Sequence, residues 1–297
     1  MPLAPAALQH EWRTAGGAIR LDRPVIAGIL NVTPDSFWDG GRHDSVAAAV
    51  RHAAVMLEAG ADMIDIGGES TRPGAAPVGA GEEIGRVIPV VEALRREWPD
   101  VALSVDTVKA SVAHAALDTG ADVINDVSGL RIDPSLAAVI ARAGAGIILM
   151  HSRGDVDRMA RYELAGYGPD PVADVLHELG GSVERARAAG IGSDAIVLDP
   201  GLGFAKRTEH SLALLAGLDR IAGLGYPVLV GPSRKRFIGD AAGAATLPVE
   251  ARLEGTIAAC VIALLHGALL FRVHDVAALR RALDFAHAAL RGGGHAG

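Results

Sequence analysis

The stretch ALLFRVHDV, residues 268–276, contains the last of eight short apolar runs that recur along the chain. Each run ends in polar residues that a purely structural core strand would not need. Side chains alternate along a strand, so Arg272 and His274 are predicted to project to the same side of a solvent-facing rim, where they could bind an anion. The alternative is an ion pair between Arg272 and Asp275, with His274 next to the start of a helix.

The apolar runs predict eight strands, at residues 25–32, 63–67, 102–106, 122–127, 146–151, 195–199, 227–231 and 268–274. They are apolar on both faces, as is typical of parallel strands that are covered by helices. Amphipathic stretches of helical length lie at residues 45–59, 81–98, 108–119, 134–143, 170–189, 209–217, 248–265 and 276–290.

The alternation of strands and helices, with about 31 residues in each unit, predicts an α/β fold: a single-domain (β/α)8 TIM barrel over residues 25–291. Residues 1–24 are expected to form a hairpin or cap, and residues 292–297 a disordered tail. A doubly wound sheet is the alternative fold, but no GxGxxG turn follows the first strand.

Composition excludes several classes of function. The net charge is -7 and there is no basic block, so we expect no nucleic-acid partner. No apolar stretch is long enough to span a membrane, and the N-terminus does not resemble a signal peptide. The only cysteine, Cys260, lies in an apolar helix, and the histidines lack zinc-site spacing. We therefore expect a soluble cytoplasmic protein with no membrane partner.

In barrels of this kind the carboxyl ends of the strands carry the active site. In this chain those ends and the loops after them hold Asn31, Asp65, Asp106, Asn125, Asp199, Lys235, Arg272 and His274. Burying such a ring is costly unless a ligand or partner pairs with it. The ring therefore predicts a binding site at this rim.

Asp106, Asp199 and Asn125 suit the 2-aminopyrimidinone edge of a pterin. A carboxylate can accept two N–H bonds, and an asparagine can both donate and accept. The alternative is that Asp106 and Asp199 only cap helices or turns.

Two loops and a basic segment could complete the site. Asn31 begins a Pro/Gly-containing loop long enough to act as a lid, and its side chain could offer an oxygen to Mg²⁺ or form an Asx turn before Pro34. Arg72, in the next loop, could clamp an oxyanion or simply be solvated. The cations at 234–236 are either part of a phosphate region or a solvated turn.

Eight segments together carry a resemblance to a known family: GILNVTPDSFWDGG (28–41), DIGGESTRPGA (65–75), SVDT (104–107), INDVSG (124–129), LMH (149–151), LDPGLGFAK (198–206), GPSRKRFIG (231–239) and FRVHDV (271–276). In this order they resemble the dihydropteroate synthases, a family of pterin-binding enzymes. The resemblance implies a transferase of folate biosynthesis that condenses 6-hydroxymethyl-7,8-dihydropterin diphosphate with p-aminobenzoate.

The resemblance also implies roles, residue by residue. The pterin would be held by Asp106, Asn125, Met150, Asp199 and Lys235. The diphosphate would be held by Asn31, Arg72, Arg272 and His274, with Mg²⁺ on Asn31. The p-aminobenzoate would be framed by Phe37, Thr71, Pro73, Phe204, Lys235 and Arg236. The catalytic residues would be Asp106, Asp199, Lys235, Arg272 and His274.

One of these positions departs from the family pattern: Arg236 stands where many members carry a serine, which leaves the orientation of p-aminobenzoate there open. The resemblance implies a homodimer formed through barrel helices. A pterin-binding methyltransferase domain is the nearest alternative, but it has no use for the diphosphate residues. A catalytically idle homologue that only binds pterin diphosphate is the second alternative.

Overall fold

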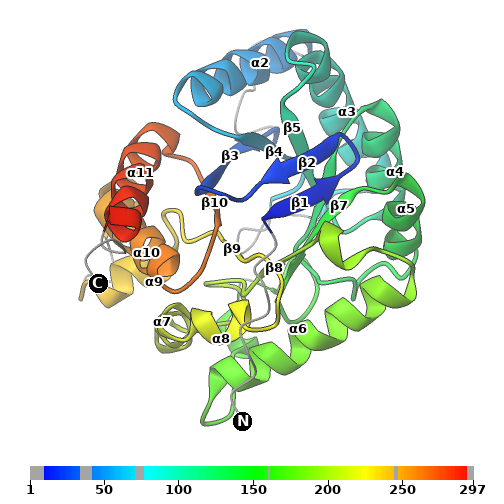
Figure 1. Cartoon of the computed structure of the whole chain (residues 1–297). Helices are drawn as coiled ribbons and strands as arrows, with labels where there is room; N and C mark the ends of the chain where they lie inside the picture. Colours follow the sequence, from blue (N-terminus) through cyan, green and yellow to red (C-terminus); the bar gives the residue numbers. More distant parts are fainter. Residues whose placement is uncertain (1–9, 34–41, 71–76, 160, 244–246, 293–297) are drawn as a thin grey trace.

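The computed structural model describes residues 10–33, 42–70, 77–159, 161–243 and 247–292. Eight parallel strands form the central sheet, in the order β8-β7-β6-β5-β4-β3-β10-β9. A parallel bridge between Leu198 and Val228 joins β8 to the segment that precedes β9, so the sheet closes on itself. The predicted (β/α)8 barrel is confirmed, and Figure 1 shows the helices arranged around it.

The strands lie where the apolar runs predicted them: β3 Val25–Asn31, β4 Met63–Gly67, β5 Ala102–Asp106, β6 Val123–Asp126, β7 Gly146–Met150, β8 Ile196–Asp199, β9 Leu229–Val230 and β10 Leu270–Val273. Residues along them are almost all buried, because the barrel interior covers one face and the helices cover the other. The strand predicted at 227–231 is reduced to two residues.

The helices are α2 Arg42–Glu58, α3 Ala80–Glu97, α4 Ala110–Thr119, α5 Leu136–Ala143, α6 Pro171–Ala188, α7 Thr208–Ala216, α8 Leu218–Ala222, α9 Arg236–Ala241, α10 Leu253–Leu265 and α11 Val276–Gly292. The start of α6 shows how the sequence sets such a boundary. Asp170 accepts hydrogen bonds from Val172 N and Ala173 N, both at 3.1 Å, and Pro171 occupies the first turn. In the described part of the chain, no helix is both long and apolar enough to cross a membrane.

A hairpin lies ahead of the barrel, made of β1 Glu11–Thr14 and β2 Gly17–Arg20. Its Trp12 is fully buried among inward-facing strand residues such as Met63 and Val197, and Trp12 Nε1 donates to Ala195 O at 2.9 Å. Ala195 comes just before β8, so the hairpin packs against the amino ends of the strands (Figure 1). The carboxyl ends, where the polar ring was predicted, are at the opposite end of the barrel.

Candidate functional site

The strand register brings polar side chains from successive strands to one level at the carboxyl end of the barrel. Asn31 is paired with Gly67, Gly67 with Asp106, and Asp106 with Asn125. Gly67 has no side chain, and a Cβ placed there would lie 3.7 Å from Asn31 Oδ1 and 4.0 Å from Asp106 Oδ2. Both oxygens therefore face the space that the glycine leaves open.

Arg272 lies inside this ring. Its Nε donates to Asp65 Oδ2 at 2.6 Å and its Nη2 to Asp106 Oδ2 at 2.9 Å. Asp65 Oδ2 also accepts from Asn125 Nδ2 at 3.2 Å. The sequence placed Arg272 at a solvent-facing rim, and this was wrong, because its side chain is only 22% exposed.

Arg272, Asp65 and Asp106 form a buried group with one cation and two carboxyl groups. Burial raises the pKa of Asp106 to about 7; the Arg272 cation opposes this effect and the Asp65 carboxylate adds to it. Asp65 Oδ1 is buried and has no hydrogen-bond partner among the described residues. One guanidinium thus neutralises two carboxylates, and a ligand that brings N–H donors would satisfy the group better.

Asp199 forms a second charged centre with Lys235. Burial raises the pKa of Asp199. Four groups oppose this change, in decreasing order of strength: the Lys235 cation, the Gly201 N–H, the Lys206 cation and the Arg272 cation. That N–H donates to Asp199 Oδ1 at 2.7 Å, so the predicted turn role is present alongside the site role. Asp106, in contrast, caps no helix, because α4 has no side-chain cap.

Lys235 lies over an aromatic ring. Its Nζ is 4.0 Å from the centroid of Phe204 and donates to Leu202 O at 2.6 Å. Burial lowers the pKa of Lys235 to about 7, and the Asp199 carboxylate opposes this change. Phe204 in turn packs in a small apolar cluster with Met150, Val108, Val127 and Met159. This cluster provides an apolar wall next to the carboxylates.

His274 and Asp275 make contacts that neither sequence interpretation named. Asp275 is paired with Arg234, whose Nε donates to Asp275 Oδ2 at 2.8 Å, so the predicted alternative of an Arg272–Asp275 pair was wrong. His274 Nδ1 lies 3.0 Å from Ser233 Oγ, and its side chain is exposed.

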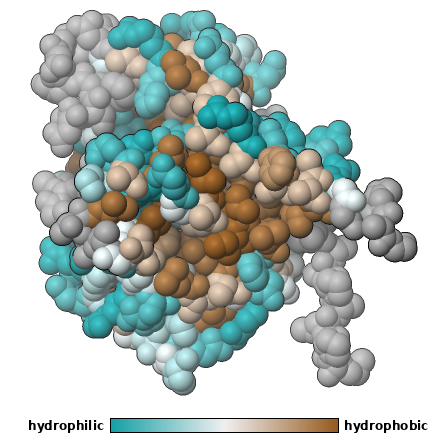
Figure 2. All heavy atoms as spheres, turned by 90° about the vertical axis from the view of Figure 1, so that its left-hand side faces the viewer, coloured by the Kyte–Doolittle hydropathy of each residue, from teal (hydrophilic) through white to brown (hydrophobic). Residues whose placement is uncertain are grey.

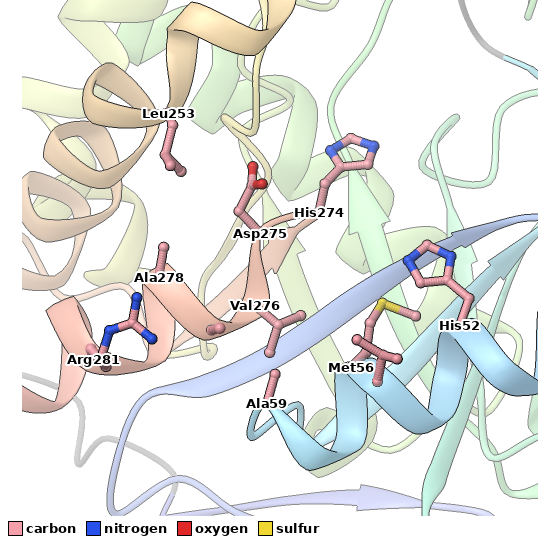
Figure 3. Close-up of a pocket in the computed structure, with 11 residues that line it drawn as sticks. His52, Met56, Ala59, Leu253, His274, Asp275, Val276, Ala278 and Arg281 are labelled. Atoms are coloured by element: carbon pink, nitrogen blue, oxygen red, sulfur yellow. The ribbon is translucent and has the colours of Figure 1, made fainter.

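His274 also borders a pocket of about 300 Å³ at the edge of the barrel (Figure 3). The pocket is lined by residues of α2, α10 and the start of α11, with His52 and Met56 among them. None of Asp106, Asn125 or Asp199 lines it. His274 is therefore at the periphery of the ring, and Arg272 is at its centre.

The Arg236 side chain is directed to its own helix. Its Nε lies 3.5 Å from Asp240 Oδ2, and its guanidinium lies 4.8 Å from the centroid of the Tyr162 ring. The side chain is mostly exposed. The backbone N–H of Arg236, in the first turn of α9, is not involved in these side-chain interactions.

Four predicted site residues, Phe37, Thr71, Arg72 and Pro73, lie outside the described residues. Sequence reasoning named Asp65 only as a polar strand end and gave no role to His151, Lys206 or Ser233. Lys206 was detectable as a lysine within the otherwise apolar and glycine-rich segment 201–206.

Comparison with known proteins gives a consistent result. A family model described as "Pterin binding enzyme" matches residues 27–274. The dihydropteroate synthase of Bacillus subtilis (strain 168) is 46% identical over 290 residues, which is 98% of this chain and 93% of that protein.

Solved structures are similar throughout the fold. The structure of Xanthomonas albilineans dihydropteroate synthase with 4-aminobenzoic acid has a TM-score of 0.86 and 46% identity, and the match covers 95% of this chain and 98% of that one. The same enzyme in complex with 7,8-dihydropteroate has a TM-score of 0.83 and 43% identity, covering 94% and 98%.

Proposed function

The chain belongs to the pterin-binding enzyme family, and from this membership we propose that it is a dihydropteroate synthase. It condenses 6-hydroxymethyl-7,8-dihydropterin diphosphate with p-aminobenzoate, giving 7,8-dihydropteroate and pyrophosphate in folate biosynthesis. The observation that carries the proposal is the ring of carboxylates, amide and cations around Arg272 beside an apolar wall.

The pterin is assigned to the floor of this ring. Asp106 and Asp199 are buried carboxylates that can accept N–H bonds from the aminopyrimidinone edge, and Asn125 can donate and accept. Met150 supplies the apolar wall for the flat ring system, and Lys235 lies next to it over Phe204.

The diphosphate is assigned to the rim itself. Arg272 uses Nε and Nη2 for the two aspartates, and its Nη1 makes no hydrogen bond to another described residue. That donor, with His274, Asn31 and Arg72, would hold phosphate oxygens. Arg72 is included on the resemblance alone.

Asn31 is the residue proposed for Mg²⁺. Its amide oxygen is a hard ligand, it faces the space above Gly67, and the side chain makes no hydrogen bond to another described residue. In the described ranges no group of three His, Cys, Asp or Glu side chains could hold a metal ion. A magnesium ion on Asn31 would therefore complete its coordination with phosphate oxygens and water, and when bound it would neutralise diphosphate charge.

The reaction forms a bond between the p-aminobenzoate nitrogen and the exocyclic carbon of the pterin. The bond from that carbon to the diphosphate oxygen breaks, its electron pair leaves with pyrophosphate, and the amine loses a proton. Arg272 and His274 stabilise the leaving group, while the Asp106 and Asp199 carboxylates stabilise positive charge that develops on the pterin. Because the arylamine is a weak nucleophile, departure of the leaving group comes first.

The p-aminobenzoate ring is assigned to the outer side of Phe204 and Lys235, where an aromatic face and a cation lie together. Phe37, Thr71 and Pro73 join this part of the site on the resemblance. The Arg236 backbone N–H, at the start of α9, is proposed to receive the carboxylate, since the side chain is occupied by Asp240 and Tyr162.

A homodimer and a cytoplasmic location complete the proposal. Figure 2 shows apolar side chains gathered on the face formed by α10 and α11, where Ile262, Leu265, Phe285 and Leu290 are 42%, 57%, 79% and 47% exposed. A patch of this kind is unusual on a monomer and is proposed to be covered by a second copy. The buried, unpaired Cys260 is consistent with a reducing compartment.

Complementation tests the function. The gene should restore growth without added folate products to a bacterial strain that lacks dihydropteroate synthase, and the Asp199→Asn gene should not. An idle homologue or a pterin-dependent methyltransferase domain would fail to restore growth even when the wild-type protein is expressed in soluble form.

A further inference from the structure

A buried chain of ionisable side chains lies next to the proposed pterin pocket and has no part in the scheme above. Lys206 is fully buried, and its Nζ lies 2.8 Å from His151 Nδ1. On the other side of the imidazole, His151 Nε2 lies 3.0 Å from Glu178 Oε2. The chain therefore runs from a partly exposed carboxylate on α6 to a lysine in the interior.

The contacts of Lys206 match an ammonium group. Its Nζ has three acceptors, His151 Nδ1 at 2.8 Å, Phe204 O at 2.9 Å and His151 O at 3.4 Å, one for each N–H of –NH₃⁺. Burial lowers the pKa of His151 to about 4, and the Lys206 cation contributes in the same direction. The ring is therefore neutral at pH 7, with Nδ1 accepting from Lys206 and Nε2–H donating to Glu178.

Glu178 is the negative charge at the outer end of this chain. Burial acts to raise its pKa, but the hydrogen bonds from His151 and Arg153 lower the pKa of Glu178 to about 2. An ionised carboxylate thus faces the chain at one end. At the other end burial lowers the pKa of Lys206 well below its usual value, and the Asp199 carboxylate is the strongest influence in the opposite direction.

The segment that Lys206 holds is a strained one that carries Phe204. Ala205, between the two, has a φ of 48°, in the left-handed region that L-residues rarely adopt. Its N–H donates to Met159 O at 2.6 Å, and the Lys206 ammonium binds the Phe204 carbonyl on the other side. A backbone in this conformation persists only where the surroundings hold it, and such positions concentrate at active sites.

Resting on the proposed function, we propose that Lys206 is a positioning residue for the synthase reaction. Its ammonium group stabilises the Asp199 carboxylate and fixes the Phe204 segment from the buried side of the pocket. Lys235 does the corresponding work from the pocket side, over the Phe204 ring. Both lysines thus act electrostatically on Asp199, and Lys235 is the one that lies over the Phe204 ring in the proposed pocket.

The charged groups around this pair define what a pH experiment would report. Asp199 is influenced by Lys235, Lys206 and Arg272. Lys206 is influenced by Asp199, Lys235, Arg153 and Glu178, with the neutral His151 in contact and His210 nearby. Asp106 is paired with Arg272, so removal of the Lys206 charge is expected to affect Asp199 selectively.

The test is the pH profile of kcat/KM for pterin diphosphate at saturating p-aminobenzoate, measured for Lys206→Met and its parent protein. All proteins compared also carry Asp106→Asn, so that the titration of Asp106 is absent and the remaining acid limb reports Asp199. Loss of the cation makes ionised Asp199 less favourable, so the acid limb of the profile should move up by about one pH unit, a tenfold loss of kcat/KM within that limb. The matched control is Ser211→Ala. Ser211 is a buried neutral side chain that accepts from Gly203 N at 3.2 Å, so this variant loosens the same segment without removing charge and should leave the limb in place.

An unmoved acid limb in Lys206→Met, or an equal shift in Ser211→Ala, would overturn the proposal. If Lys206→Met does not fold, Lys206→Gln removes the same charge and keeps an amide donor for the Phe204 carbonyl, and the same two outcomes apply. Failure of the wild-type protein to make dihydropteroate would reject the proposed function before the variants are compared, so the two failures are distinct.

Discussion

At the level of single residues, Arg272 has a structural role beside the anion binding proposed for it. Its guanidinium lies between Asp65 and Asp106, and Asp65 is almost completely buried. Arg272 is the only cation paired with Asp65 among the described residues, and a buried carboxylate that loses such a partner is destabilising by about 3–5 kcal/mol. Substitution of a solvent-facing cation would weaken only ligand binding. Substitution of Arg272 is therefore expected to lower stability as well.

We predict that Arg272→Met lowers turnover at least a hundredfold and also lowers the free energy of unfolding by about 3 kcal/mol. Adding Asp65→Asn to this variant should recover much of the stability but none of the turnover. Urea denaturation and steady-state assays of both variants measure the two effects. A single variant as stable as wild type would contradict the view that Arg272 neutralises Asp65.

Asp106 predicts a pH dependence of pterin binding. Its pKa is raised from about 3.8 to about 7 by burial, so the ligand-free protein carries it half protonated near neutral pH. Only the carboxylate can accept two N–H bonds, so the affinity for a pterin analogue should fall up to tenfold per pH unit below 7. Calorimetric titrations between pH 5.5 and 8.5 measure this, and Asp106→Asn should bind more weakly and lack the limb near pH 7. If the affinity of the wild-type protein does not change over this pH range, Asp106 does not titrate there.

At the level of elements, an ion-pair cluster joins α3, α4 and the segment after β4. Lys109, which precedes α4, donates from Nζ to Glu69 Oε2 at 2.7 Å and to Glu83 Oε2 at 2.5 Å. Glu83 is fully buried on α3, and Glu69 Oε1 accepts from Val78 N at 2.8 Å. The cluster thus joins Glu69 to Val78, two described residues on either side of positions 71–76.

We predict that Lys109→Met lowers the free energy of unfolding by about 3–5 kcal/mol, because two carboxylates lose their shared cation. Lys109→Met combined with Glu83→Gln should recover part of this loss, since the buried charge is then removed as well. Urea denaturation of the wild type, both single variants and the double variant forms the cycle. Strict additivity of the two single changes would mean that Lys109 and Glu83 are not coupled.

The elements also show what a sequence can predict. The apolar runs located all eight strands, because each strand is buried on both faces and reads as a continuous stretch. The helices α8 and α9 were not predicted, since five or six residues are too few to show a helical period. The contact between Arg272 and Asp65 joins residues 207 positions apart, and only the closed barrel brings them together. For the same reason the chain from Glu178 to Lys206 left no signal beyond a lysine in an apolar segment.

At the level of the whole molecule, the face of α10 and α11 is predicted to form the dimer. Phe285→Glu should convert the protein to a monomer in sedimentation velocity experiments, because it places a charge on a side chain that is 79% exposed in the single chain. Leu224→Glu is the control, since Leu224 is exposed in the turn after α8, outside this face. Equal sedimentation of wild type and Phe285→Glu would exclude this face as the interface.

The central claim is that the polar ring at the carboxyl ends of the strands condenses the two substrates. The most direct measurement is product analysis with purified protein, Mg²⁺, pterin diphosphate and p-aminobenzoate. The account predicts 7,8-dihydropteroate and pyrophosphate in equal amounts from wild type. For Asp199→Asn it predicts a rate at least a hundredfold lower, measured on variant protein shown by circular dichroism to be folded. Near-normal turnover in Asp199→Asn, or pyrophosphate release without dihydropteroate in wild type, would contradict it.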